Sequence, residues 1–469
     1  MKKKTGIIDE PINDESFDLL DINLHTDSII NFIKETETPI TIGIQGEWGS
    51  GKTSLIQSIK SELNKDKVFR QIWINSWEYS LLTNPEESLI KIINRIIQEL
   101  LQSDKKISQH AKISEVTKKI FEGALRVGAG VVGGSNAASA AQTLFDESGQ
   151  NISALRLQLN NLVEKIQNKN SNNYKKIIIY IDDLDRIEPK NAVILLELLK
   201  NIFNVRHCIF ILAIDYQVVV KGLEHKFGKP TIDNEWEFRA FFDKIIQLPF
   251  MMPMSQYNIG KYVNKLLIDI GFTDDGGLDD NAIKEIILTT IGGNPRSIKR
   301  LVNSISLIEI FSRKRNSLVA SDGTSSTTET PDIQKKFLLF ALLCLQIAYP
   351  HIYELLNQSP DFTKWDDKFA FFITQKSEES KLEYPEFHTQ FQHAQETEGF
   401  NEEWEKSLYR ICYIRTRLRN NSQNISRFLN YIKNDVLKDQ PDTIGDRIRD
   451  ALSQTSVTNV TRVKQRKRN

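Results

Sequence analysis

Cysteine is scarce in this chain, with three in 469 residues and no two of them in a CxxC pair. This scarcity excludes a disulfide-framed scaffold and a zinc knuckle, and a reducing cytoplasm is the simplest setting. Net charge is also lacking, because 61 basic side chains oppose 61 acidic ones, which argues against a histone-like polyelectrolyte. A hydrophobic fraction of 40% can form substantial cores, and the length indicates two or three domains.

Long apolar runs are missing as well. The start of the chain is basic but lacks the apolar stretch of a secretory signal. Residues 127–145 carry no charge, yet their glycines and polar residues leave them too polar to span a bilayer. Residues 337–349 are far more apolar but end at Pro350, which is the length of a buried core helix. We therefore expect a cytoplasmic protein without a membrane partner.

Short β-branched runs alternate with segments of helical spacing, which predicts a parallel sheet sandwiched by helices. The five expected strands are residues 40–44, 71–75, 175–181, 207–213 and 245–250. The last contains Pro249 and therefore fits an edge strand. Between the second and third strands, residues 81–173 form a helical insertion, with helices expected at 85–102, 114–125 and 152–168.

The first catalytic signal is the sequence GEWGSGKT at residues 46–53, which satisfies the phosphate-loop pattern GxxxxGK[ST] between a strand and a helix. Glycines let backbone N–H groups curl around phosphates, and the helix N-terminus adds its positive dipole end. Lys52 then reaches the β- and γ-phosphate oxygens, and Thr53 coordinates Mg²⁺. The alternative is an ordinary glycine turn. The expected nucleotide-binding residues are Gly46, Glu47, Trp48, Gly49, Ser50, Gly51, Lys52, Thr53 and Ser54.

Two of these loop residues need a separate explanation. The carboxylate of Glu47 would repel phosphates, so this side chain must point outward. Trp48 packs either against a lid or neighbouring subunit, or into the core against the insertion.

Two carboxylates end the third strand, in the sequence IIIYIDD at residues 177–183. We assign Asp182 to the Mg²⁺ shell and Asp183 to the attacking water, the alternative being a solvated acidic turn. Because another strand separates them from the phosphate loop in sequence, the chain fits the ASCE division of P-loop NTPases. Asn75 and Asp215, at the ends of the second and fourth strands, are either polar sensors of the nucleotide or Asx caps of the following segments.

Six motifs in order then resemble one family, the KAP family of P-loop NTPases, over about residues 15–360. They are IGIQGEWGSGKT (42–53), INSWEY (74–79), IDDLDR (181–186), ILAID (211–215), KIIQLPF (244–250) and GNPRSIKR (293–300). The resemblance implies an ATPase of the ASCE/STAND-like type, with a helical domain after the sheet, used by bacteria in signalling or phage defence. Family members often carry transmembrane helices in the insertion, and here that insertion is too polar.

The resemblance also assigns two arginines. It implies that Arg296 lies near the nucleotide phosphates as a sensor, whereas from the residues alone an exposed basic helix face is the alternative. Arg186 is either an arginine finger acting in trans or an ion-pair partner of Asp182 or Asp185. The expected catalytic residues are therefore Lys52, Asp183, Arg186 and Arg296.

The rest of the chain is predicted to be helical. We divide it into an NTPase domain at 1–253, a helical sensor or lid domain at 254–330 with a polar linker at 316–331, and an all-α region at 332–469. Expected helices include 281–291, 295–312 and 337–356. Basic residues interleaved with tyrosines at 406–419, and a basic tail after residue 461, suit phosphate neutralisation and base stacking; a salt-bridged helix face and a frayed tail are the alternatives.

The sequence therefore predicts a Mg²⁺-dependent ATPase whose ATP binding and hydrolysis drive a conformational or oligomeric switch. The alternatives are an ATP-binding scaffold that engages nucleic acid through its basic region, and a small-molecule phosphotransferase. Expected partners are ATP, further copies of the chain in a homo-oligomer, and a separately encoded effector protein, because no nuclease, protease or deaminase motif is present.

Overall fold

The computed structural model describes most of the chain. The described residues are 4–9, 20–80, 85–102, 156–157, 159–161, 163–164, 167, 174–202, 204–274, 276–321, 333–375, 386–398, 400–438 and 441–455. They divide into two compact units, one formed by Glu10–Pro253 and the other by Met254–Asn469 together with Met1–Asp9. The first residues therefore belong with the C-terminal unit, whereas the sequence assigned them to the NTPase domain.

The N-terminal unit is built on a five-stranded sheet in which every strand pair is parallel. Its strands are β1 (Ile40–Gln45), β2 (Phe69–Asn75), β3 (Lys176–Asp182), β4 (Cys208–Ile214) and β5 (Leu248–Met251), in the spatial order β2-β3-β4-β1-β5. The expected α/β class is confirmed. Because β4 lies between β1, the strand before the phosphate loop, and β3, the strand that ends in Asp182, the sheet has the ASCE arrangement.

One strand boundary was predicted too early. The sequence placed the last strand at 245–250, but Ile245 is the final residue of α9 (Glu235–Ile245) and β5 begins at Leu248. Phe241, Phe242 and Ile245 give this helix an apolar face that is buried in the core. Packing of that face keeps Ile245 in the helix instead of the strand. The edge position expected from Pro249 is confirmed, since among the described strands β5 pairs with β1 alone.

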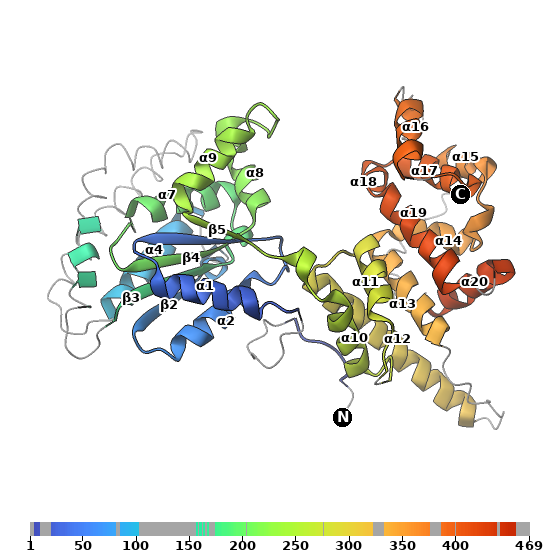
Figure 1. Cartoon of the computed structure of the whole chain (residues 1–469), viewed down its shortest axis with the longest axis horizontal. Coiled ribbons are helices and arrows are strands. Elements are labelled where there is room, and N and C mark those ends of the chain that lie inside the picture. The colour runs from blue at the N-terminus through green and yellow to red at the C-terminus, as the bar shows by residue number, and fades with distance from the viewer. Residues whose placement is uncertain are drawn as a thin grey trace, which may run out of the picture. The chain divides into compact units, whose positions relative to one another are not determined.

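Helices cover both faces of the sheet because its strands are apolar on both sides. In β3, Ile177, Ile179 and Ile181 belong to one core cluster, whereas the hydroxyl of Tyr180 donates to Gln71 Oε1, and Gln71 Nε2 donates to the carbonyl of Lys60 in α2. Figure 1 shows α1 and α2 on one side of the sheet and α7, α8 and α9 on the other. The remaining bounds are α1 (Asn23–Glu35), α2 (Lys52–Asn64), α3 (Ser76–Ser80), α4 (Pro85–Gln102), α7 (Pro189–Ile202) and α8 (Tyr216–Phe227).

The start of the expected insertion is part of this core. Helix α4 has the bounds that the sequence predicted, and its Ile92, Ile96 and Leu100 are fully buried in the same cluster as β3 and α7. Such i, i+4 spacing places these side chains on one face of the helix. The expected helix at 114–125 and the Gly/Ala stretch at 127–145 lie outside the described residues, as does most of 152–168.

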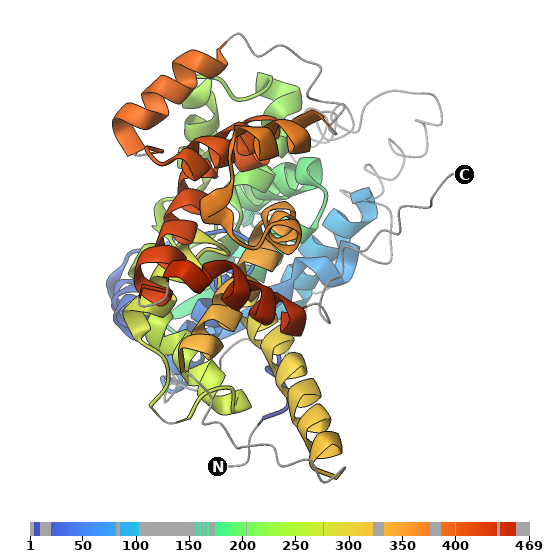
Figure 2. The same ribbon diagram turned by 90° about the vertical axis from the view of Figure 1, so that its right-hand side faces the viewer.

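The described part of the C-terminal unit is helical (Figure 2). Its helices are α10 (Ile259–Ile270), α11 (Asp280–Thr289), α12 (Pro295–Ser321), α13 (Ile333–Ala348), α14 (Pro350–Gln358), α15 (Asp367–Gln375), α16 (Phe387–Glu398), α17 (Glu403–Tyr413), α18 (Thr416–Arg419), α19 (Ser422–Tyr431) and α20 (Ile444–Thr455). Helix α12 continues six residues into the segment expected to be a polar linker.

Helix α13 is the core helix that the apolar run predicts. Its residues from Phe337 to Gln346 are buried, including Leu343 and Leu345 at 0% exposure. The expected single helix 337–356 is wrong in one respect, because it breaks at Tyr349 and a new helix starts with Pro350 in its first turn. Among the residues that the structure describes, no helix combines the length and the apolar character needed to cross a membrane.

Candidate functional site

The phosphate loop runs from the end of β1 to the start of α2. Gly49 and Gly51 have φ angles of 89° and 101°, a left-handed backbone that suits glycine and that turns successive N–H groups toward one side. At Gly46, an added Cβ would lie 2.6 Å from Ser50 Oγ and 2.9 Å from Met252 Cγ, so a larger residue would force its neighbours to shift. The loop therefore has the backbone that phosphate binding needs, and the 13-residue helix α2 starts directly after it.

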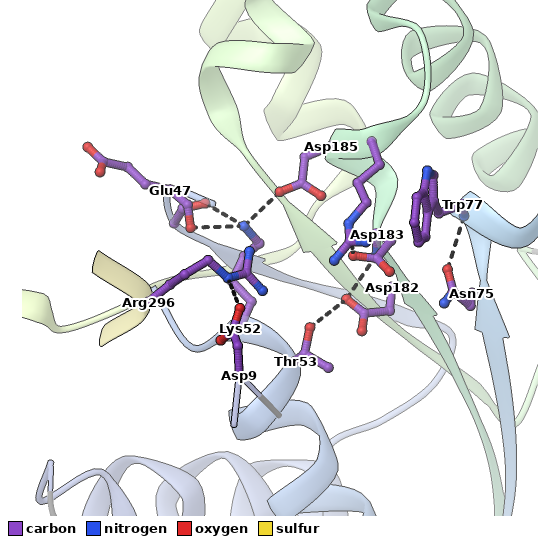
Figure 3. A network of polar contacts seen from close by, with 12 residues as sticks. Asp9, Glu47, Lys52, Thr53, Asn75, Trp77, Asp182, Asp183, Asp185 and Arg296 are labelled. Atoms are coloured by element: carbon purple, nitrogen blue, oxygen red, sulfur yellow. Dashed lines mark hydrogen bonds and ion pairs between the residues drawn. The ribbon is translucent and has the colours of Figure 1, made fainter. Parts of the chain in front are cut away.

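Lys52 is the buried cation of this loop, with its side chain only 7% exposed. Its Nζ donates to the carbonyls of Gly46 at 2.8 Å and Glu47 at 3.2 Å, and to Asp185 Oδ2 at 3.0 Å (Figure 3). The two carbonyls belong to the phosphate loop, so they hold the ammonium group of Lys52 beside the loop backbone.

Thr53 and Asp182 are brought together as expected for a Mg²⁺ site. The Thr53 hydroxyl donates to Asp182 Oδ1 at 3.2 Å, and the backbone N–H of Asp183 donates to the same oxygen at 2.9 Å (Figure 3). Burial raises the pKa of Asp182, and the hydrogen bonds from Asp183 and Thr53 oppose that rise. The arrangement offers two oxygen ligands at the end of β3, which is the donor chemistry that Mg²⁺ takes.

Asp183 directs the turn that follows β3. Its φ of 58° and ψ of 30° are left-handed, and Leu184–Arg186 then form a short 3₁₀ turn. Its carboxylate forms an ion pair with Arg186, with 2.7 Å between Oδ1 and Nε. Burial, together with the negative charge of Asp182, raises the pKa of Asp183 to about 6, although Arg186 opposes this rise. A carboxyl group with such a pKa can accept a proton near neutral pH.

Arg186 is held on its other side by an aromatic ring. The guanidinium carbon lies 4.6 Å from the ring centroid of Trp77, at a distance typical of a cation–π contact. The sequence proposed Asp182 or Asp185 as an ion-pair partner, but the observed partner is Asp183. The reason is the left-handed turn at Asp183, which points Asp183 and Asp185 in different directions (Figure 3).

The two candidate sensors at strand ends both act as caps. Asn75 Oδ1 accepts from the backbone N–H of Trp77 at 3.0 Å, and Asp215 Oδ1 accepts from that of Gln217 at 3.0 Å. Each therefore satisfies the first turn of the following helix, α3 or α8. Their positions at the carboxyl ends of β2 and β4 agree with the sequence prediction, and a contact with nucleotide stays a prediction.

The two unusual loop residues are exposed. The Glu47 side chain points away from Lys52, as required of a carboxylate near phosphates (Figure 3). Trp48 is 61% exposed, so its expected packing into the core is wrong.

Arg296 lies at the start of α12, in the C-terminal unit. Its Nε lies 2.6 Å from Asp9 Oδ2, and its backbone N–H donates to Asn294 Oδ1 at 3.1 Å. The predicted role of Arg296 as a phosphate sensor stays a prediction, and its observed anionic partner is a carboxylate of its own unit.

The basic segment at 406–419 does not have the surface that base stacking requires. Tyr409 and Tyr413 are 6% and 3% exposed and pack against Phe400, Phe387 and Phe391. The expectation that they stack bases is therefore wrong, because they form part of a small aromatic core. Three of the arginines are bound within the unit, Arg410 to Asp367, Arg417 to the carbonyl of Ala348 and Arg419 to the carbonyl of Tyr413. The basic tail after residue 461 lies outside the described residues.

Asp185 belongs to the site, but the sequence analysis named it only as a possible ion-pair partner of Arg186. Its carboxylate is 5% exposed and pairs with Lys52. The signal was present in the sequence IDDLDR, but the contact depends on the left-handed backbone of Asp183, which residue types do not reveal.

Comparisons with known proteins identify the family of the domain that contains this site. The family model described as the KAP family P-loop domain matches residues 23–311, which is more than half of the chain. The chain is also 25% identical over 242 residues to the phage T7 exclusion protein of Escherichia coli K12, an alignment that covers 46% of this chain and 30% of that relative. It thus spans less than a third of the relative's length.

A solved structure also aligns with the chain. The Aeropyrum pernix ORC2 protein, determined in ADPNP and ADP complexes, is 11% identical with a TM-score of 0.31, and the alignment covers 94% of this chain and 96% of that one. The family assignment comes from the matched domain and from the motifs that meet at the end of β3. On these grounds the chain belongs to the KAP family of P-loop NTPases.

Proposed function

We propose that this protein binds ATP with Mg²⁺ and hydrolyses it to ADP and phosphate. The observation that carries the proposal is the meeting of three groups at one sheet edge: the buried Lys52 ammonium, the Thr53 hydroxyl and the Asp182 carboxylate. Phosphate oxygens would bind the N–H groups of the phosphate loop and Lys52. Trp48, Ser54, Asn75 and Asp215 are kept as nucleotide-binding proposals from the sequence.

Thr53 and Asp182 would hold the Mg²⁺ ion. Among the described residues, no group of three or more His, Cys, Asp or Glu side chains could hold a metal. A site with one hydroxyl and one carboxylate fits Mg²⁺, which keeps several waters and takes phosphate oxygens as its other ligands. When bound there, Mg²⁺ neutralises charge on the β- and γ-phosphates.

Asp183 is our candidate for the residue that acts on the attacking water, and its raised pKa supports this role. Its side chain accepts a proton from water as the oxygen attacks the γ-phosphorus and the bond to the β–γ bridging oxygen breaks. Arg186 holds one of its oxygens, which orients the carboxylate. We keep Arg186 as a candidate arginine finger and Arg296 as a candidate phosphate sensor, the latter from the family resemblance alone.

The test is phosphate release by the purified full chain with ATP, Mg²⁺ and no other acceptor. Lys52→Ala should weaken ATP binding about tenfold or more, because a hydrogen bond to a charged group contributes about 1.5–3 kcal/mol. Asp183→Asn should still bind ATP but release phosphate about 10²–10⁴-fold more slowly. The control is Lys65→Ala, because Lys65 is an exposed residue at the C-terminal end of α2, the helix that begins with Lys52. Undiminished hydrolysis by Asp183→Asn rejects its role, and release only with an added acceptor favours the phosphotransferase alternative.

We further propose that nucleotide turnover drives a conformational or oligomeric switch in phage exclusion. This proposal rests on the similarity to the phage T7 exclusion protein of Escherichia coli, which extends over 242 residues. Cells that express the chain should reduce plating of a phage panel that includes T7, and Lys52→Ala should restore plating. Sizing the protein with and without ATP and Mg²⁺ distinguishes assembly from a change within one copy. Equal plating on both cell lines would remove the exclusion proposal and leave the ATPase proposal untouched.

A further inference from the structure

The ammonium group of Lys52 has no uncommitted proton. An ammonium has three N–H donors, and three oxygens surround Nζ at hydrogen-bonding distance, those of Gly46, Glu47 and Asp185. Two of these are backbone carbonyls of the phosphate loop, and the third is a carboxylate. A phosphate oxygen can accept a full hydrogen bond from Lys52 only if Lys52 withdraws its N–H from one of these three acceptors.

Asp185 is the acceptor that should compete most strongly. The two carbonyls are fixed by the loop, but the carboxylate carries a full charge and comes from the turn after β3. Lys52 and Asp185 are 7% and 5% exposed, so their attraction is only weakly screened by solvent. The same burial strengthens the repulsion between Asp185 and any phosphate that reaches Lys52.

We propose that Asp185 is a positioning residue that orients Lys52 at the phosphate loop and competes with nucleotide phosphates for it. Asp185 thereby lowers the affinity for nucleoside diphosphates and triphosphates, which favours release of the product ADP. This inference rests on the proposed function, because it concerns the same loop.

The competition predicts a gain of affinity on mutation, which damage to the fold would not produce. Asp185→Asn keeps an oxygen acceptor for Lys52 but removes the charge, so the dissociation constant for ADP with Mg²⁺ should fall about tenfold, equal to about 1.4 kcal/mol. Asp185→Glu, which keeps the charge, should stay close to wild type. Glu188→Gln is the matched control, because it removes a charge from the same segment at an exposed side chain.

The measurement is isothermal titration of the full chain with ADP and Mg²⁺, with circular dichroism to confirm folding. Asp185→Ser is made in parallel, so that one neutral variant can replace the other. Tighter binding by a neutral variant, with Glu188→Gln unchanged, supports competition. Unchanged or weaker binding overturns it, as does failure of both neutral variants to fold, which would make the ion pair purely structural.

A second readout does not depend on nucleotide. The rate at which an amine-acylating reagent labels Lys52 in the nucleotide-free protein should rise in Asp185→Asn and stay unchanged in Glu188→Gln. Equal labelling in wild type and Asp185→Asn overturns the orienting role of Asp185. A wild-type chain that binds no nucleotide contradicts the proposed function, whereas normal wild-type binding with no gain in Asp185→Asn contradicts this inference alone.

Discussion

At the scale of single residues, the backbone conformation of Asp183 determines where the two carboxylates in the turn after β3 point. Asp183 is left-handed, and the chain then folds back in a 3₁₀ turn. As a result the carboxylate of Asp185 reaches Lys52, while that of Asp183 reaches Arg186. A different backbone at this one residue would place both carboxylates elsewhere, so the site depends on a conformation that costs about 1–2 kcal/mol for a residue other than glycine.

Another residue-scale feature concerns stability rather than chemistry. His351 lies in the first turn of α14, and burial, with a smaller contribution from Arg415, lowers the pKa of His351 to about 4. Its ordinary value, 6.5, applies in the unfolded chain. The folded state therefore binds this proton less tightly than the unfolded state does.

We predict a loss of stability on acidification that involves this histidine. A depressed folded-state pKa contributes stability above the unfolded value of about 6.5, and this contribution is lost as the pH falls toward about 4. His351→Gln should show a shallower fall of the unfolding temperature across that window than wild type does. Thermal denaturation at steps from pH 7 to pH 4 measures the difference. His388→Gln, with an exposed ring, is the control; identical slopes in wild type and His351→Gln would contradict the prediction.

At the scale of elements, the strands of the sheet and their ASCE arrangement could be predicted, but the start of β5 could not. β3 and β4 are continuous apolar runs, and such runs mark buried parallel strands. The start of β5 depends on which residues the preceding helix buries, and Ile245 belongs to the buried face of α9. The meeting of Lys52, Thr53 and Asp182 follows from motif and strand ends, whereas the partner of Arg186 and the burial of Tyr409 depend on contacts between elements.

The packing of α7 against α8 offers a test at this scale. Gly222 lies where the helices approach, and an added Cβ would be 2.2 Å from the carbonyl oxygen of Pro189 and 2.8 Å from Val193 Cγ2. Gly222→Ala should lower the free energy of unfolding by about 1–3 kcal/mol, as overpacking does. Chemical denaturation of the full chain measures this. Gly276→Ala, where nothing lies within 4 Å of the added Cβ, is the control; equal effects of the two substitutions would show that no close approach exists.

At the scale of the whole molecule, the chain passes between its two units twice, after Asp9 and after Pro253. The first residues bind within the C-terminal unit. Asn303 in α12 donates to the carbonyl of Ile7 at 2.9 Å and accepts from its N–H at 2.7 Å, and Ser306 donates to the carbonyl of Thr5 at 2.7 Å. At one end of the segment, Lys4 pairs with Asp269, and at the other, Asp9 pairs with Arg296. Polar contacts thus attach residues 4–9 to the C-terminal unit, whereas the side chain of Ile8 is 72% exposed.

Because Asn303 makes two hydrogen bonds to Ile7, we predict that it holds residues 4–9 against α12. Asn303→Ala removes both hydrogen bonds to Ile7. Each contributes about 0.5–1.5 kcal/mol to the free energy that holds the middle of the segment 4–9 in place. Hydrogen exchange at residues 4–9, followed by mass spectrometry of the full chain, should accelerate about fivefold or more, while exchange in α10 stays unchanged. Ser304→Ala is the matched control, because the Ser304 hydroxyl donates to the carbonyl of Arg300 within α12 and not to residues 4–9. Equal exchange of residues 4–9 in the two variants would mean that the terminal ion pairs, and not Asn303, hold this segment. Lys4→Ala and Asp9→Asn would then become the variants that release it.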